Sequence, residues 1–482
     1  MVSISRPETT ARPRTRHKMY ALRVATRAVG RVAATGTLQP TRAAVGLVRL
    51  PLRGVVTSIP KARGRDQDLE ISAKGQGGEV RMQAAAAGIA DVTMKHDESM
   101  LKLSWSTGGT DTYPYVWLRD NCQCPLCFHS GSRSRVHLIE ELDLNARPRS
   151  AKVLGGQAVE VQWSDGHVSR YEASWLLPRA FQSAENYIRK PSYKLTPHPW
   201  GSELMEDLPR ASFPEMMSDD AALLKWSQQL EIFGFVMVSG APAEPGQVRR
   251  LAERIAFIKK THYGEDFTVI VKDDPSNVAY LSGPLQLHAD LPYYQYKPGV
   301  QFIHCIKQYE GNGGDSQVTD GLHAANLLRE NHPQKYRILT STPVDWFDEG
   351  SDEVGEFLKI LQLPMICTDS YGDVCRINFS QPQRDSFFDI PAEDVAAWYD
   401  AMKTFHRLLA DPKNCLHFKM TPGTIMTFDN LRILHGRTAY LSGYSARHIE
   451  GCYVDWDEVR SRRHVLEKKL GVNSRRLVRR EE

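Results

Sequence analysis

The stretch LQLHADLPYY, residues 285–294, places His288 and Asp290 two positions apart in an apolar, tyrosine-flanked segment. Successive side chains of a β-strand point to opposite faces, so residues two positions apart leave the same face. On such a strand, the imidazole and the carboxylate form two adjacent ligands of a candidate metal site. The remaining question is whether the chain supplies a third ligand elsewhere.

The third candidate ligand is His435 in FDNLRILHGR, residues 428–437, where it follows a strand-like run and precedes a glycine turn. Two imidazoles and one carboxylate hold one face of an octahedral Fe(II) and leave three positions for substrate and dioxygen. An HxD motif is weak by itself, because strands often carry a His and an Asp at a solvent-facing end. Arg447 strengthens the iron hypothesis, because a guanidinium can bind a distal carboxylate through two hydrogen bonds.

Three of the eight cysteines crowd into NCQCPLCFH as Cys122, Cys124 and Cys127. Thiolates at this spacing share one tetrahedral Zn(II), which needs a fourth ligand. The candidates for that ligand are His129, His137 and His167. A closed Cys3His site predicts a structural role, with three free thiols and a nucleic-acid-binding zinc module as alternatives. The other cysteines are scattered and no secretory signal is seen, which indicates a reduced compartment.

Charge is unevenly distributed along the 482 residues. Residues 1–65 carry fourteen Lys or Arg and one acid, Glu8, which leaves 47 basic and 56 acidic residues in the remainder. A mildly acidic body is a poor candidate for nucleic-acid binding. No apolar run approaches the ~18 residues that a membrane span needs.

The basic N-terminal segment has the composition of a mitochondrial transit peptide, because it is rich in Ala, Thr and Val and nearly free of acids. Arg23, Arg27 and Arg31 recur at helical spacing, opposite an apolar face. We therefore expect a mitochondrial matrix protein. A disordered basic arm and a cytoplasmic location are the alternatives.

Pattern and composition divide the chain into three parts. Residues 1–90 are predicted to be a transit peptide and a disordered segment. Residues 91–185 show short strand-like pieces between turns, which predicts a small β-rich zinc-binding domain. Residues 205–475 combine many short strands and Gly-rich turns with helices, which favours an α+β, mainly β sandwich or jelly-roll barrel. AANLLRENHPQKYRILTS, residues 324–341, is predicted as one helical segment.

A family resemblance rests on four segments that match in order and spacing: NVAYLSGPLQLHADLPYY (277–294), GVQFIHCIKQ (299–308), FDNLRILHGR (428–437) and RHIEGCYVDWDEVRSR (447–462). They resemble the gamma-butyrobetaine dioxygenase branch of the Fe(II)/2-oxoglutarate oxygenases, whose wider group includes trimethyllysine dioxygenase and taurine dioxygenase. The likeness covers roughly residues 95–470. It implies a double-stranded β-helix (jelly-roll) catalytic domain and a homodimer.

The resemblance also implies roles for single residues. His288, Asp290 and His435 would be the iron ligands, and Arg447 would bind the far carboxylate of 2-oxoglutarate. The interval from His435 to Arg447 is one residue shorter here than in the family. Arg437 is therefore the fallback for the carboxylate.

Zinc and substrate residues are matched to the family by position. His167 matches the fourth zinc ligand, and Asn277 is a candidate to bind the substrate carboxylate. The trimethylammonium cage corresponds to Tyr263, Phe267, Tyr280 and Tyr453. The family has Trp where this chain has Phe267, which weakens cation–π attraction by ~0.5–1 kcal/mol. For any single aromatic residue, core packing is the alternative.

The reaction that the resemblance implies is hydroxylation of gamma-butyrobetaine to L-carnitine, a step of carnitine biosynthesis. It is coupled to oxidative decarboxylation of 2-oxoglutarate to succinate and CO2, with Fe(II) as the metal, O2 as the oxidant and ascorbate as the reductant. N6-trimethyllysine hydroxylation on the same scaffold is the first alternative. A non-catalytic ligand-binding barrel and a protein-directed hydroxylase are the others.

Overall fold

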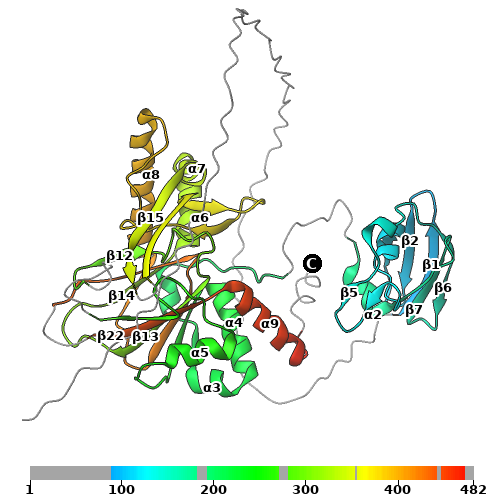
Figure 1. Cartoon of the computed structure of the whole chain (residues 1–482), viewed down its shortest axis with the longest axis horizontal. Coiled ribbons are helices and arrows are strands. Elements are labelled where there is room, and N and C mark those ends of the chain that lie inside the picture. Colours follow the sequence, from blue (N-terminus) through cyan, green and yellow to red (C-terminus); the bar gives the residue numbers. More distant parts are fainter. Residues whose placement is uncertain (1–87, 182–192, 271–280, 353–354, 442–446, 473–482) are drawn as a thin grey trace, which may run out of the picture. The chain divides into compact units, whose positions relative to one another are not determined.

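The computed structural model, drawn in Figure 1, describes residues 88–181, 193–270, 281–352, 355–441 and 447–472. The predicted transit peptide lies almost wholly outside the described residues, and Asn277 and Tyr280 also lie outside them. Among the helices of the described ranges, none has the length and apolar composition that a bilayer crossing requires.

Residues 88–181 form two three-stranded antiparallel sheets. The first sheet contains β1 (Ile89–Lys95), β2 (Met100–Trp105) and β3 (Thr110–Pro114). The second contains β6 (Pro148–Leu154), β7 (Ala158–Trp163) and β8 (Val168–Glu172). Shorter elements are the helices α1 (Tyr115–Asp120) and α2 (Ala173–Leu176) and the strands β4 (Phe128–His129) and β5 (Ser134–Arg135). Alternate residues of β2 and β7, such as Leu103 and Val161, share one buried core.

The chain from residue 193 onward is built on two further sheets. The six-stranded sheet has the order β11 (Asp266–Val269), β22 (His448–Val454), β13 (Val300–Lys307), β20 (Thr424–Asp429), β10 (Phe235–Ser239) and β9 (Arg210–Ser212). The four-stranded sheet has the order β12 (Leu285–His288), β21 (Ile433–Arg437), β14 (Ser316–Asp320) and β19 (Cys415–Phe418). The strands pair antiparallel in both sheets, except that β9 and β10 are parallel.

These two sheets enclose a shared core, which confirms the predicted jelly-roll class. Phe235 and Ile303 of the larger sheet meet Val318 of the smaller sheet in one buried cluster. On the other face of the larger sheet, Val300 and Phe302 pack in a second cluster with helical residues. Strand β13 is therefore buried on both faces: its first six residues are all buried, including the polar Gln301 and His304.

Helices cover the outer faces of the two sheets (Figure 1). The helices against the six-stranded sheet are α3 (Phe213–Ser218), α4 (Asp220–Phe233), α5 (Gln247–Ile255) and α9 (Trp456–Lys469). Beside the four-stranded sheet lie α6 (Gly321–Asn331), α7 (Pro333–Ser341) and α8 (Ala392–Ala410). Two hairpins join this second group, β15 (Pro343–Asp352) with β16 (Gly355–Pro364), and β17 (Ile366–Thr368) with β18 (Val374–Ile377).

The segment 324–341 was predicted as one helix and is two. Helix α6 begins earlier than predicted, where the carboxylate of Asp320 accepts a hydrogen bond from Leu322 N at 2.9 Å. It ends before His332, whose φ of −140° and ψ of 61° are not helical. A residue that precedes proline is disfavoured in the helical region, and Pro333 then begins α7.

Candidate metal centres and active site

His288 and His435 lie opposite each other on neighbouring strands. His288 ends β12 and pairs with His435 of β21, and the centroids of their rings are 4.4 Å apart. Asp290 Oδ1 lies 3.1 Å from His288 Nε2 and 3.8 Å from His435 Nε2. The three donor atoms all lie within 4.8 Å of one another. The structure therefore brings the three predicted iron ligands together.

Asp290 reaches this position from a turn rather than from a strand. Strand β12 ends at His288, so the expectation that both side chains leave one strand face is wrong for Asp290. Asn430 holds the turn, because its Oδ1 accepts from Asp290 N at 2.9 Å and its Nδ2 donates to Asp290 O at 3.1 Å. Leu291 follows with a φ of +56°, which bends the chain out of the extended conformation.

The protonation states suit metal binding. Burial, together with the nearby His288, lowers the pKa of His435 to about 3, so this imidazole is neutral at physiological pH. Burial works to raise the pKa of Asp290, but His435, His288 and the Tyr453 hydroxyl outweigh it and hold the pKa below its ordinary value. His288 Nδ1 lies 2.8 Å from Gln286 O and donates to it, which leaves the Nε2 lone pair for a metal.

The donor set fits Fe(II). Two neutral imidazoles and one carboxylate form the facial set that non-heme iron oxygenases use. Neighbouring positions of an octahedron with bonds of about 2.1 Å are about 3 Å apart. The distance of 3.1 Å between His288 Nε2 and Asp290 Oδ1 matches that spacing, and the distance of 3.8 Å between His435 Nε2 and Asp290 Oδ1 is longer.

The guanidinium groups of Arg447, which is half-buried, and Arg437, which is buried, lie against the ring of Tyr440. Their Cζ atoms lie 6.0 Å and 4.7 Å from the centre of that ring. Burial, with Arg437 nearby, lowers the pKa of Arg447 to about 10. Arg447 Nε is a buried atom with no hydrogen-bond partner among the described residues. Arg437 Nη2 donates to Leu281 O and Gly283 O. A desolvated guanidinium nitrogen without a partner destabilises the fold, so this position favours an anionic ligand such as a carboxylate.

Three of the predicted cage residues form a row of rings that begins at Asp290. Tyr453 Oη donates to Asp290 Oδ2 at 2.6 Å. The ring of Tyr453 lies 5.3 Å from Phe267, and Phe267 lies 6.1 Å from Tyr263. Phe267 packs directly over its cross-strand partner Gly451, where an added Cβ would come within 2.3 Å of its ring.

His262 and Phe357 extend this row of rings, and Asp348 is linked to it through Tyr293, which also hydrogen-bonds to Tyr263. The sequence did not reveal these three residues. The His262 ring centroid is 4.0 Å from Tyr263 and 4.0 Å from Phe357. Asp348 forms a hydrogen bond with the hydroxyl of Tyr293. Phe357 and Asp348 belong to the β15–β16 hairpin, which carries no sequence motif. The only indication in the sequence was that His262 directly precedes the predicted cage residue Tyr263.

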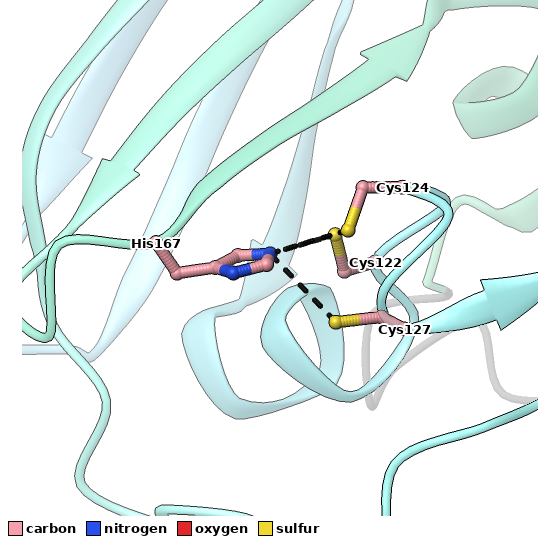
Figure 2. Close-up of side chains that lie close together, drawn as sticks. All are labelled: Cys122, Cys124, Cys127 and His167. Atoms are coloured by element: carbon pink, nitrogen blue, oxygen red, sulfur yellow. Dashed lines mark hydrogen bonds between the residues drawn. The ribbon is translucent and has the colours of Figure 1, made fainter.

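The three clustered cysteines and His167 point toward one common centre (Figure 2). His167 Nε2 lies 3.2 Å from Cys122 Sγ, 3.6 Å from Cys124 Sγ and 3.7 Å from Cys127 Sγ. A tetrahedral zinc with Zn–S bonds of about 2.3 Å and Zn–N bonds of about 2.0–2.1 Å separates such atoms by about 3.5 Å. The four residues therefore fit a zinc ion.

The two other histidines considered as zinc ligands are engaged elsewhere. His129 Nδ1 lies 2.9 Å from Ser132 Oγ, and His137 Nε2 lies 3.3 Å from Asp120 Oδ1. The turn between β7 and β8 carries His167, and this turn is what brings its imidazole to the cysteines.

Arg119 supplies positive charge beside the cysteine cluster. With a Zn²⁺ ion bound, three thiolates and a neutral imidazole would together carry one negative charge. Arg119 Nη1 donates to Cys127 Sγ at 3.5 Å and would offset that charge. Asp165 pairs with Arg119 at 3.3 Å and accepts from the backbone N of His167 at 2.8 Å, so it links the guanidinium to the fourth ligand.

Comparison with known proteins gives the family. Residues 191–453 match the model of the taurine catabolism dioxygenase TauD, TfdA family, and residues 92–177 match that of the gamma-butyrobetaine hydroxylase-like N-terminal region. Gamma-butyrobetaine dioxygenase of Homo sapiens is 38% identical over 377 residues, which cover 77% of this chain and 95% of the human protein. The chain belongs to the gamma-butyrobetaine dioxygenase family.

Two further relatives set the position within this group. Gamma-butyrobetaine dioxygenase of Pseudomonas sp. (strain AK-1) is 33% identical over 370 residues, covering 77% of this chain and 94% of that protein. The mitochondrial trimethyllysine dioxygenase of Mus musculus is 28% identical over 379 residues, covering 78% of this chain and 87% of that protein. As a member of the gamma-butyrobetaine dioxygenase family, the chain is an Fe(II)/2-oxoglutarate-dependent dioxygenase, and the predicted enzyme class is confirmed.

The zinc fit generates a prediction for the Cys124→Ser variant. Removing one thiolate from a four-ligand site is expected to reduce bound zinc from one per chain to near zero, and to lower the thermal midpoint of the part that carries the site. Metal content by mass spectrometry and differential scanning calorimetry measure both. The control is Cys375→Ser, which removes an exposed thiol outside the cluster. Retention of one zinc by Cys124→Ser would contradict the prediction.

Proposed function

We propose that this protein hydroxylates gamma-butyrobetaine to L-carnitine. The observation that carries the proposal is the order of identities over similar shares of the chain: 38% and 33% with two gamma-butyrobetaine dioxygenases, and 28% with the mouse trimethyllysine dioxygenase. N6-trimethyllysine is therefore the second candidate substrate. A non-catalytic barrel is disfavoured because the complete donor set is present and Arg447 Nε is buried with no partner among the described residues.

In this proposal the metal and the cosubstrate are held by four side chains. His288, Asp290 and His435 hold Fe(II), and Arg447 binds the far carboxylate of 2-oxoglutarate. When bound, these two supply the oxidising chemistry: 2-oxoglutarate is decarboxylated to succinate and CO2 while one oxygen atom of O2 enters a substrate C–H bond. Ascorbate is the proposed reductant. The chain contributes orientation of the target C–H bond and exclusion of water.

The proposed substrate is a cation that cannot donate hydrogen bonds, so its binding relies on aromatic faces. Tyr263, Phe267 and Tyr453 offer such faces in a row that reaches Asp290. Tyr280 is assigned to the same cage, and Asn277 to the substrate carboxylate, by family resemblance alone. A cation held on the row of rings would place its chain beside the metal ligands.

The zinc assignment and the domain division belong to the same proposal. Cys122, Cys124, Cys127 and His167 are proposed to hold a structural zinc within a domain of residues 91–185. Residues 205–475 are proposed as the catalytic domain. A homodimer is proposed from the family resemblance.

The N-terminal segment generates a prediction about cellular location. Its basic, acid-poor composition and the mitochondrial relative support import into the mitochondrial matrix, with cleavage before the zinc-binding domain. Residues 1–90 fused to a fluorescent protein are expected to co-localise with a matrix marker. The control is a fusion in which Arg23, Arg27 and Arg31 are changed to Glu. This fusion should remain outside the mitochondrial matrix. Diffuse cytosolic signal from the unmodified fusion would favour the cytoplasmic alternative.

The substrate assignment generates a competition assay. The purified protein, given Fe(II), 2-oxoglutarate and ascorbate, is expected to turn over gamma-butyrobetaine with a kcat/KM at least 10-fold above that for N6-trimethyllysine, because related enzymes discriminate by differential contacts in the cage. Mass spectrometry of the hydroxylated product and enzymatic detection of succinate follow both reactions. Asp290→Ala is the inactive control. The reverse order of preference would replace the proposed substrate, and no product from either would favour the non-catalytic barrel.

The departure at Phe267 generates a second prediction about the cage. Phe267→Trp is expected to lower KM for gamma-butyrobetaine about 2–5-fold, because indole attracts a cation more strongly by ~0.5–1 kcal/mol. The matched control ligand is 5,5-dimethylhexanoate, in which a neutral carbon replaces the nitrogen. Its inhibition constant should change by less than that factor. An equal change for the cation and the neutral isostere would mean that shape, rather than charge, acts at residue 267.

A further inference from the structure

The two oxygens of the Asp290 carboxylate have different surroundings. Oδ1 lies 3.1 Å from His288 Nε2 and 3.8 Å from His435 Nε2. Oδ2 instead accepts two hydrogen bonds, one from Gln301 Nε2 at 2.7 Å and one from Tyr453 Oη at 2.6 Å. Oδ1 therefore faces the two imidazole nitrogens of the proposed metal site, while Oδ2 is bound by protein donors.

The two donors are held rigidly by the six-stranded sheet. Gln301 of β13 and Tyr453 of β22 are direct cross-strand partners, and each residue is 1% exposed. Strand β13 is itself paired on its other edge with β20. Because the sheet fixes both backbones, the Gln301 amide and the Tyr453 hydroxyl reach the same oxygen without a flexible loop between them.

The presence of a glutamine at the buried position 301 is not explained by a contribution to the stability of the core. An ionised carboxylate only accepts hydrogen bonds, so Asp290 fixes the amide with its NH2 group toward Oδ2. The amide oxygen of Gln301 is then buried with no partner among the described residues. A buried polar atom without a partner destabilises the fold, and an apolar side chain of similar size would avoid this cost. The amide is therefore explained by its donation to Asp290.

Resting on the proposed function, we infer that Gln301 and Tyr453 are positioning residues that hold Asp290 as a one-oxygen metal ligand. With Oδ2 occupied by two donors, the carboxylate presents only Oδ1 to the metal. A carboxylate free to rotate can also bind through both oxygens, and that mode consumes a second coordination position. The two donors thus preserve a position that cosubstrate or dioxygen needs. Tyr453 has this role in addition to its place in the row of rings.

The test removes each donor while keeping the volume of the side chain. Full-length Gln301→Met and Tyr453→Phe proteins, with the cysteine cluster first saturated with Zn(II), are titrated with Co(II), which replaces Fe(II) and reports its coordination through visible absorption. Each variant is expected to bind Co(II) 10–100-fold more weakly than wild type. The absorption bands should also shift, as the second carboxylate oxygen enters the coordination sphere. With Fe(II), the ratio of succinate to hydroxylated product should rise.

Two controls separate positioning from structure. Ile303→Val shortens a buried neighbour on the same strand, and should lower the unfolding midpoint without altering Co(II) affinity. Gln301→Met should keep or raise the midpoint while metal affinity falls, a combination that general destabilisation cannot produce. Tyr453→Phe retains the ring, so it remains informative if Gln301→Met fails to fold.

The outcomes distinguish this inference from the proposed function. Unaltered Co(II) affinity and spectra in both variants, with normal binding by wild type, would overturn the positioning role and leave the dioxygenase assignment intact. Wild-type protein whose Co(II) binding is insensitive to Asp290→Ala would overturn the proposed metal site, and the positioning role with it.

Discussion

The antiparallel register of β12 and β21 is the constraint on which the candidate iron site depends. It places His288 directly opposite His435, and a slip of one residue would turn one imidazole to the other face of the sheet. Gly436 permits the close approach, because a Cβ there would lie 2.8 Å from Leu285 O. On its other edge β21 pairs with β14, where Val318 lies opposite His435. Backbone pairing therefore makes neighbours of two histidines that are far apart in the sequence.

The cysteine cluster was more readily predicted than the iron site, for a physical reason. Three of its four ligands lie within six residues, so one turn suffices to gather them. The choice among three histidines could not be made from spacing, because they follow Cys127 by 2, 10 and 40 residues and sequence separation does not say which imidazole the fold brings to the cysteines. His129 and His137 are taken by Ser132 and Asp120, contacts that only the folded chain reveals. Family resemblance named His167, and the geometry agrees with it.

The surroundings of the iron ligands could not be predicted from the sequence. The HxD pattern and His435 were visible because few residue types bind metals, but the strand argument placed Asp290 wrongly. Its position depends on Asn430, which is distant in the sequence and looks like an ordinary turn residue. Gln301 and Phe357 are likewise common residues whose roles arise from register and hairpin packing. The helix break before Pro333 was encoded locally and was overlooked.

The ring of Tyr453 packs against Phe267, and its hydroxyl donates a hydrogen bond to the candidate metal ligand Asp290. Under the proposed function, a replacement of Tyr453 that changes the shape of the cation-binding row would also remove or move the hydroxyl that binds Asp290. A change of substrate is therefore not expected to arise at this residue. Phe267 lies on β11, the edge strand of its sheet, and its side chain has no polar atom to lose. Divergence toward larger or smaller cations is therefore expected to run through residue 267.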